Sequence, residues 1–435
     1  MNKKNMTSRN LWVSSIETIL GSKTITWKKQ QISLLSAIEN MSVIKNSERY
    51  KLWNIITKSL EDIGVFAEHE LTALITDKYI NDQIRNYEKP FTSVILSYQN
   101  ETKAVENIIH TISTIGFEAS GTYYKNKAWA HKLKNFSYTD RYRTLGKLPQ
   151  INFSEGAEIL REVLYEFKSE YGEFFDSLLL NGHIDVYPKK YKQGGAFMSS
   201  GTYEPTMIFL NHTDSFDSLQ TLAHEVGHAI HSYCTAKSQP VCYQDYSMVT
   251  AETASTFFEQ LLFQKVYDQS DTKTKHILLE HKLDRITSTV MRQTAFFNFE
   301  LSLHEHIRSE GSIDSKTIAT LFSKHIKKYM GANVNVNITD GYSYVYIGHF
   351  RRMFYVYSYA YGQLISSLMF NMYKNDKSYK NSIHDFLCSG ASNSVENIYR
   401  SIGIEPNNPD VIENALTEYK QDIKTFKKNS TKFRS

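Results

Sequence analysis

The sequence predicts a mainly α-helical fold with one small β-sheet, because proline is scarce and apolar residues recur at helical spacing. Only 7 of the 435 residues are proline, and none lies between Val241 and Glu405. Since proline ends or kinks helices, that segment can form long ones. The prolines of the middle stretch mark the irregular part of the chain: Pro149, Pro188, Pro205 and Pro240.

The N-terminal part is expected to form amphipathic helices. Apolar side chains recur there at steps of three and four residues, which places them on one buried helix face: Leu52, Ile55, Ile56, Leu60, Ile63, Leu71, Leu74 and Ile75. Between Tyr187 and Asn211 the pattern changes. The segments 194–197 and 205–210 resemble two short strands around a glycine-containing turn.

The composition excludes several classes of protein. Hydrophobic residues make up 41% and charged residues 22%, as in ordinary globular chains. A formal charge of +4 is too small to indicate nucleic acid as a partner. The 3 cysteines cannot form a disulfide framework and favour a reducing compartment. The start lacks the apolar stretch of a secretion signal, and no run of about 18 apolar residues predicts a membrane span, so we expect a cytoplasmic protein.

Residues 221–231 contain the pattern His-Glu-x-x-His, formed by His224, Glu225 and His228. The spacing places two imidazoles one helical turn apart on one face, where they can hold a single zinc ion. A buried core histidine is the usual alternative for a lone His. Two at this spacing, away from the apolar stripe of the same helix, favour metal binding.

A second helical segment, residues 250–262, provides a candidate third ligand. Glu252, Thr256 and Glu259 lie opposite its apolar stripe. Glu252 would complete a three-ligand site with a fourth position open to water, as in catalytic zinc sites, and Glu225 would act on that water as general base. Glu259 either orients a ligand imidazole or forms an exposed ion pair. Without the upstream motif, both glutamates are ordinary residues of a solvated helix face.

The segment 341–362 is rich in tyrosine and contains His349. Such side chains can donate hydrogen bonds to the oxyanion that develops during peptide cleavage. The alternative is a tyrosine-rich helix that packs against other helices.

These motifs together resemble the thimet oligopeptidase and oligoendopeptidase F family of zinc metallopeptidases, more closely the oligoendopeptidase F branch. Residues 224–232 are similar to the metal-binding helix of the family, and residues 252–259 to the segment that supplies its third ligand. Residues 184–188 and 194–197 resemble the glycine-bearing strand beside the cleft, and the segment from His349 onward resembles the transition-state-binding segment. Two positions depart from the family pattern: Gly348, where proline is frequent, and Arg351, where an aromatic residue is common.

The resemblance implies a two-lobed helical metallopeptidase fold with a deep channel and a small β-sheet beside the zinc site. The expected lobes are a helical one over residues 1–150, shortened relative to the family, and a catalytic one over residues 151–435. The resemblance also implies one Zn²⁺ per chain and short peptides as substrates. We expect substrate contacts from Gly195, Ala196, Phe197 and Tyr342, and transition-state contacts from His349, Tyr355 and Tyr359.

The function expected from the sequence is zinc-dependent hydrolysis of internal bonds in short oligopeptides, by attack of a zinc-bound water with Glu225 as general base. Two alternatives stay open. One is a processing protease dedicated to a single leader or signal peptide. The other is a zinc-containing peptide-binding module with little catalysis, which the intact set of His224, Glu225, His228 and Glu252 disfavours.

Overall fold

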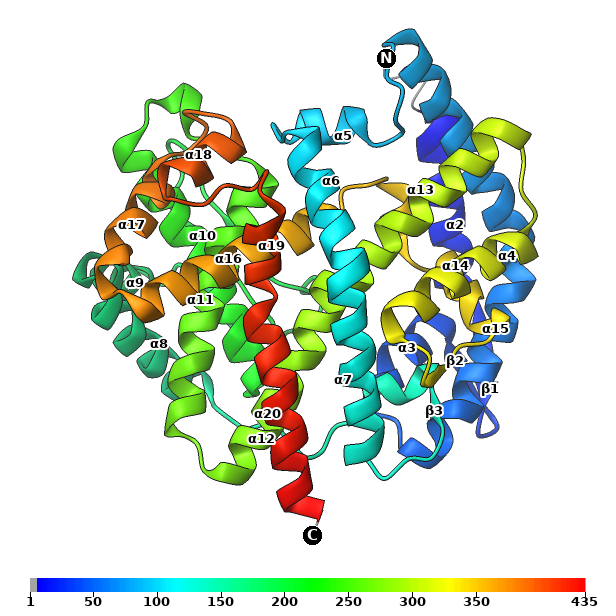
Figure 1. The fold of residues 1–435 in the computed structure, drawn as a ribbon, viewed down its shortest axis with the longest axis horizontal. Helices are drawn as coiled ribbons and strands as arrows, with labels where there is room; N and C mark the ends of the chain where they lie inside the picture. Colours follow the sequence, from blue (N-terminus) through cyan, green and yellow to red (C-terminus); the bar gives the residue numbers. More distant parts are fainter. Residues whose placement is uncertain (1–5, 435) are drawn as a thin grey trace.

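The computed structural model describes residues 6–434 and is mainly helical (Figure 1). The helices of its first part are α2 (Leu11–Ser22), α3 (Leu34–Glu39), α4 (Asn46–Ile84), α5 (Thr92–Ser97), α6 (Thr102–Thr111), α7 (Phe117–Ala130), α8 (Phe153–Phe167) and α9 (Ser169–Leu180). The later ones are α10 (Phe216–Ser238), α11 (Met248–Gln269), α12 (Thr272–Ile286), α13 (Gln293–Glu310), α14 (Ser315–Met330), α15 (Ile338–Gly341), α16 (Tyr357–Asn375), α17 (Lys380–Cys388), α18 (Val395–Ser401), α19 (Pro409–Ala415) and α20 (Thr417–Arg434).

The helices form two halves, which confirms the predicted two-lobed fold (Figure 1). One half contains α8 to α11 and α16 to α18. The other contains α2 to α4 and α13 to α15, and α6, α7 and α20 run between them. Helices α13, α14 and α15 pack against α4, so the second half combines segments far apart in the sequence. The division of the chain at residue 150 stays a prediction.

Helix α4 explains the apolar repeat near the N-terminus. It is one continuous helix of 39 residues, and it spans both of the apolar runs noted in the sequence. Seven of the eight repeat positions are buried, and Ile55 is partly exposed. The repeat positions therefore form the buried face of α4, as their spacing predicts.

The strands are short and form three small sheets. The hairpin β1 (Thr24–Trp27) and β2 (Gln30–Ser33) is antiparallel, and β3 (Phe136–Ser137) pairs in parallel with β7 (Val334–Asn335). The third sheet has the order β4, β6, β5 and consists of β4 (Ile184–Asp185), β6 (Met207–Phe209) and β5 (Phe197–Ser199). Strand β5 is antiparallel to β6 and packs against α10. This is the expected sheet with one added strand, and β5 is one of its two edge strands.

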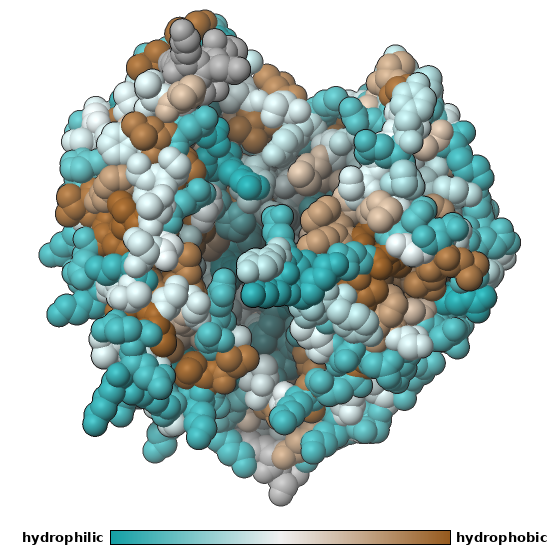
Figure 2. All heavy atoms as spheres, turned by 180° about the vertical axis from the view of Figure 1, so that it is seen from behind, coloured by the Kyte–Doolittle hydropathy of each residue, from teal (hydrophilic) through white to brown (hydrophobic). Residues whose placement is uncertain are grey.

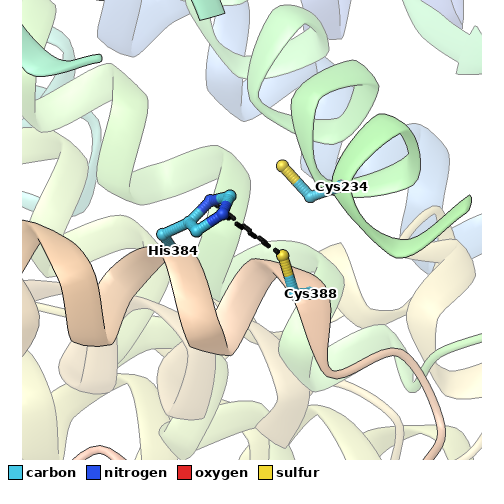
Figure 3. A group of neighbouring side chains, drawn as sticks. All are labelled: Cys234, His384 and Cys388. Atoms are coloured by element: carbon cyan, nitrogen blue, oxygen red, sulfur yellow. Dashed lines mark hydrogen bonds between the residues drawn. The ribbon is translucent and has the colours of Figure 1, made fainter. Parts of the chain in front are cut away.

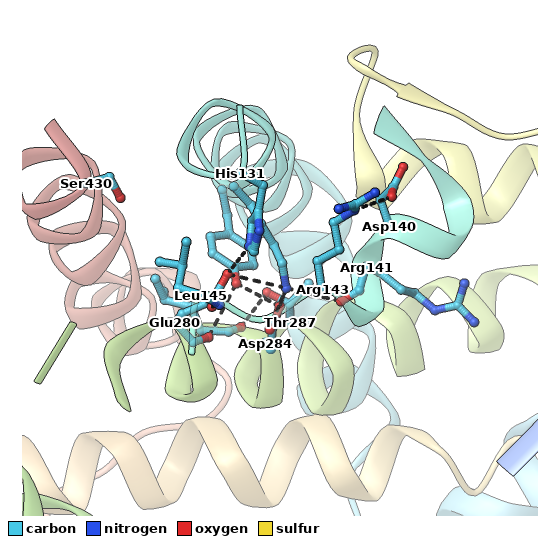
Figure 4. A network of polar contacts seen from close by, with 12 residues as sticks. His131, Asp140, Arg141, Arg143, Leu145, Glu280, Asp284, Thr287 and Ser430 are labelled. Atoms are coloured by element: carbon cyan, nitrogen blue, oxygen red, sulfur yellow. Dashed lines mark hydrogen bonds and ion pairs between the residues drawn. The ribbon is translucent and has the colours of Figure 1, made fainter. Parts of the chain in front are cut away.

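A buried polar network connects α7, α12 and the loop after the short helix η4 (Tyr138–Tyr142) (Figure 4). The ammonium of Lys127 lies 2.6 Å from Asp284, and His131 Nε2 lies 2.7 Å from Glu280. Glu280 also accepts a 2.6 Å hydrogen bond from the backbone N–H of Leu145. Buried charges are stable only when they are paired and hydrogen-bonded in this way.

The back of the molecule is hollowed along the seam between the halves, and hydrophilic side chains line much of the hollow (Figure 2). The opening agrees with the channel that the family resemblance implies. None of the helices in the described part of the chain has both the length and the apolar character that a membrane crossing requires.

Candidate metal centre

Two neighbouring helices bring His224, His228 and Glu252 together. Helix α10 carries both histidines, and α11 carries the glutamate. The two Nε2 atoms lie 3.1 Å apart, and His224 Nε2 lies 3.8 Å from Glu252 Oε2. One ligand atom from each residue falls within 4.8 Å of the others. Two imidazoles and one carboxylate converging on one point match the donor set of a three-ligand zinc site.

Close contact between the helices makes this convergence possible. A Cβ atom on Gly227 of α10 would lie 2.7 Å from the Cα of Ser255 in α11. A Cβ atom on Gly362 of α16 would lie 2.8 Å from the Cβ of Glu252. Glycine therefore lets α11 fit between α10 and α16, because real side-chain carbons do not approach that closely. Gly227 lies next to a ligand in the sequence, so its role is to set the distance between the two ligand-bearing helices.

Glu259 fixes the orientation of the first histidine. Its Oε1 accepts a hydrogen bond of 2.5 Å from Nδ1 of His224, and its Oε2 lies 2.5 Å from Arg285 Nη2. With the proton on Nδ1, Nε2 of His224 is free to bind a metal. Burial raises the pKa of Glu259, but Arg285 and His224 outweigh it and hold the pKa below its usual value. The sequence left an imidazole contact and an exposed ion pair as alternatives for Glu259. The structure contains the imidazole contact together with an ion pair to Arg285, but Glu259 is buried, so the ion pair is not an exposed one.

No pattern in the sequence indicates that Arg285 is a partner of Glu259. It belongs to α12, and 26 residues separate it from Glu259.

Burial lowers the pKa of His224, but Glu259 and the neighbouring acids raise it to about 9 when no metal is present. A metal ion on Nε2 would compete with that second proton.

Glu225 lies beside the ligands and is 6% exposed. Burial raises its pKa, and a hydrogen bond from the backbone of Met198 in β5 acts in the opposite direction. A carboxylate with a raised pKa is a better proton acceptor near neutral pH than an exposed one. The contact with Met198 also links the candidate base to the edge strand β5.

The predicted substrate residues Gly195, Ala196 and Phe197 lie at the start of this edge strand. The Gly195 carbonyl accepts a 2.8 Å hydrogen bond from Asn211 Nδ2, and Gly195 itself has φ +88°, a conformation that favours glycine. Phe197 is 47% exposed and stacks on Phe209 of β6 at 4.7 Å. Ala196 packs against the core. The strand is therefore held by side-chain packing against β6 and the core, while its outer edge pairs with no other strand of the sheet in the part of the chain that the structure describes.

His349, Tyr355 and Tyr359 form one cluster. His349 Nδ1 lies 2.5 Å from Tyr355 Oη, and the Tyr359 hydroxyl donates to Tyr355 Oη at 3.5 Å. Burial, Arg292 and Arg352 lower the pKa of His349 to about 4, which keeps its imidazole neutral.

Tyr359 connects this cluster to the candidate metal ligand Glu252. Its pKa is raised by burial first, then by Tyr355 and the charge of Glu252, so its hydroxyl stays protonated and available as a donor. Tyr355 and His349 also border a cavity of about 490 Å³ whose opposite wall is α2. The structure thus brings together the three residues that the sequence predicts as transition-state donors.

Arg351, one of the two departures from the family pattern, forms a buried ion pair with α4. Its guanidinium contacts both oxygens of Glu70, at 2.9 and 2.6 Å, and Glu70 is 0% exposed. The guanidinium also donates to the carbonyls of Tyr344 and Ile347. Arg351 therefore attaches the segment around His349 to α4, a role that the sequence does not reveal because 281 residues separate the partners.

Tyr342 is placed differently from the other predicted substrate residues. It lies in η7 (Tyr342–Val345), which packs against α4. Its side chain is 5% exposed, and its neighbours include Gly64 and Glu61. Little of its surface is open to a ligand, so a substrate contact from Tyr342 stays a prediction.

The helical fold and this two-helix ligand set are typical of the class of zinc metallopeptidases. Residues 121–418 match the description of peptidase family M3. The match covers well over half of the chain, and the chain belongs to this family.

Named relatives and solved structures agree with that assignment. The chain is 29% identical over 353 residues to the chromosomal oligoendopeptidase F of Lactococcus lactis subsp. cremoris, across 80% of this chain and 58% of that protein. It is 31% identical over 277 residues to oligopeptidase PepF of Bacillus subtilis, across 63% of this chain and 41% of that protein. The chain thus spans about half the length of these relatives.

The fold is shared with solved structures at low sequence identity. A putative peptidase from Chlamydophila abortus superposes with a TM-score of 0.86 at 22% identity, covering 96% of this chain and 72% of that one. Oligoendopeptidase-F from Enterococcus faecium superposes with a TM-score of 0.76 at 18% identity, covering 97% and 72%. These matches confirm the predicted helical fold class.

Proposed function

We propose that this protein is a zinc-dependent endopeptidase that hydrolyses internal bonds of short oligopeptides. The observation that carries the proposal is the convergence of His224, His228 and Glu252, with the buried carboxylate of Glu225 beside them. A zinc ion bound by the three ligands would supply a Lewis acid that polarises the scissile carbonyl. The names of the relatives, oligoendopeptidase and oligopeptidase, support short peptides as the substrate class.

The other side chains of the site have separate roles in the reaction. Glu225 accepts the proton of the attacking water and delivers it to the leaving amine. The open edge of β5 pairs with the substrate backbone as an added strand, which gives affinity without strong dependence on side chains. The neutral His349 and the hydroxyls of Tyr355 and Tyr359 donate hydrogen bonds to the developing oxyanion. Glu259 holds His224 in the orientation that metal binding requires.

The hollow between the two halves (Figure 2) supports a preference for unfolded peptides. We place the candidate metal centre inside this hollow, which an extended chain can enter and for which a folded domain is too wide. We also place the protein in the cytoplasm, because Cys234, Cys242 and Cys388 are all free thiols, as is usual in a reducing compartment.

The test uses the zinc-loaded full chain and a quenched fluorescent peptide of about ten residues. Glu225→Gln should lower kcat by about 10²- to 10⁴-fold, the usual contribution of a general base, and should keep stoichiometric zinc because Glu225 is not a ligand. Glu173→Gln, at an exposed glutamate of α9, is the matched control and should keep wild-type activity.

Two results contradict the proposal. Full activity in Glu225→Gln would refute the assigned base. Tight peptide binding by the zinc-loaded wild-type protein without any cleavage would favour the peptide-binding module instead. The same ten residues embedded in a folded domain should resist cleavage, and efficient cleavage there would refute the preference for unfolded substrates.

A further inference from the structure

A second group of reactive side chains lies where the end of α10 packs against α17. It contains Cys234 of α10 and the pair His384 and Cys388 of α17 (Figure 3). One ligand or nucleophile atom from each residue lies within 4.8 Å of the others. Cys388 Sγ lies 3.7 Å from His384 Nε2. The two helix ends are held side by side by a hydrogen bond from Gln239 Nε2 to the Cys388 carbonyl.

Both nitrogens of His384 already have partners. The Lys168 ammonium donates to Nε2 at 2.8 Å, so Nδ1 carries the ring proton and donates to Tyr171 Oη at 2.7 Å. Cys234 Sγ lies 3.6 Å from the same hydroxyl. Tyr171 is 0% exposed, so this chain of contacts is fixed in the protein interior.

The charge around the sulfur atoms favours an anion over a divalent cation. A metal ion on these three residues would displace Lys168 or Tyr171 from His384 and would then face a lysine ammonium of like charge. The same ammonium stabilises a thiolate. The charge of the neighbouring acid Glu170 is balanced by Lys168 at 3.1 Å and Lys237 at 2.7 Å.

The two thiols differ in pKa and in exposure, as a nucleophilic cysteine and its resolving cysteine do. A hydrogen bond from Cys234 is the largest cause that lowers the pKa of Cys388 to about 6, against the opposing effect of burial, and His384 and Lys168 add to it. Its contact with Cys388 and burial raise the pKa of Cys234. Cys388 is partly exposed and Cys234 is buried. Oxidation-sensitive cysteines have this combination of thiolate character, access and a nearby second thiol.

We propose that Cys388 is an oxidation-sensitive nucleophile for hydrogen peroxide and that Cys234 resolves it as an intramolecular disulfide. In the first step the Cys388 thiolate attacks one peroxide oxygen. The S–O bond forms, the O–O bond breaks, and the leaving hydroxide takes a proton to become water.

In the second step Cys234 gives up its proton and attacks the sulfur of the Cys388 sulfenic acid. The S–S bond forms, the S–O bond breaks, and the hydroxide that leaves combines with the proton from Cys234 to give a second water. Two thiols and one peroxide thus become one disulfide and two waters.

The geometry allows the bond and places it where it affects the metal helix. Cys388 is the last residue of α17, where the backbone can adjust as the sulfur atoms approach to the ~2.05 Å of a disulfide. Cys234 lies six residues beyond His228 on α10, about 9 Å along the helix axis. The disulfide therefore fastens the helix that carries both histidine ligands to α17.

The test treats the reduced full-length protein with hydrogen peroxide at pH 7 and maps its thiols by mass spectrometry without reduction. The wild type and Cys242→Ser should both form the 234–388 disulfide with a loss of about 2 Da per chain, because one bond replaces two thiol protons. Cys234→Ser should stop at a Cys388 sulfenic acid, which dimedone traps. In Cys388→Ser the other two thiols should stay reduced. In Cys242→Ser, alkylation of Cys388 by iodoacetamide should have its pH midpoint near 6.

Three results overturn the proposal. They are three free thiols after peroxide treatment, a disulfide that includes the exposed Cys242, and a loss of one zinc equivalent in Cys388→Ser, which would mark the group as a metal site. The proposal does not depend on peptidase activity, since every readout is a mass, a thiol count or a metal content.

Discussion

Replacing Gly227 with alanine should separate the two helices that carry the metal ligands. An added Cβ would lie 2.7 Å from the Cα of Ser255 and 3.2 Å from the ring of Phe258. Carbon atoms in contact prefer about 3.5 to 4 Å. Helix α11 must therefore move away from α10 by nearly 1 Å, because backbone atoms cannot turn aside as a flexible side chain can.

The displacement has two expected costs. Overpacking of a core typically lowers the free energy of unfolding by about 1 to 3 kcal/mol, and the better helix propensity of alanine returns at most about 1 kcal/mol. The same movement carries Glu252 away from His228. A shift of about 1 Å in a catalytic group can lower the rate by roughly 10²-fold, so activity should fall more than stability.

The assay compares urea unfolding, zinc affinity by chelator competition and peptide hydrolysis. Gly21→Ala is the matched control, because Gly21 lies in the exposed part of α2 with nothing within 4 Å of an added Cβ. It should be stabilised by up to about 1 kcal/mol and keep its zinc. If Gly227→Ala is as stable and as active as the wild type, close packing of α10 on α11 does not set the geometry of the site.

Three further changes test other contacts. Glu259→Gln should weaken zinc binding by about 10- to 100-fold, since it removes the charge that orients His224; unchanged affinity in chelator competition would show that the contact is dispensable. Burial raises the pKa of Glu300 to about 8, so the stability of the wild type should decline as pH rises from the unfolded pKa near 4.3 towards 8; Glu300→Gln should decline less in urea unfolding between pH 5 and 8, and parallel curves would contradict the shift. Arg351→Met should cost about 3 to 5 kcal/mol by leaving Glu70 charged and buried, and the double variant with Glu70→Leu should recover most of that loss; purely additive losses would show that the pair is not coupled.

The candidate metal ligands on the first helix could be proposed from the sequence because their motif is local. His224, Glu225 and His228 lie within one turn of a helix, and their spacing alone fixes which side chains share a face. Glu252 could be proposed because it carries a carboxylate and lies on the polar face of a second amphipathic helical segment. The helical fold followed from periodicity and from the lack of proline after Val241.

The supporting contacts were not predictable, because their partners are distant in the sequence. Arg285 reaches Glu259 across 26 residues, and Arg351 reaches Glu70 across 281. Each residue alone has the appearance of an ordinary surface charge. The strand order of the small sheet, with β4 beside β6, likewise depends on a pairing between segments that no local pattern specifies.

Anomalous diffraction at the zinc absorption edge, on crystals of the zinc-loaded protein, tests the central claim most directly. The account predicts one peak per chain, about 2.0 to 2.2 Å from Nε2 of His224, Nε2 of His228 and a carboxylate oxygen of Glu252. No peak at these residues in excess zinc, or a peak held by Cys234, His384 and Cys388 instead, would contradict it.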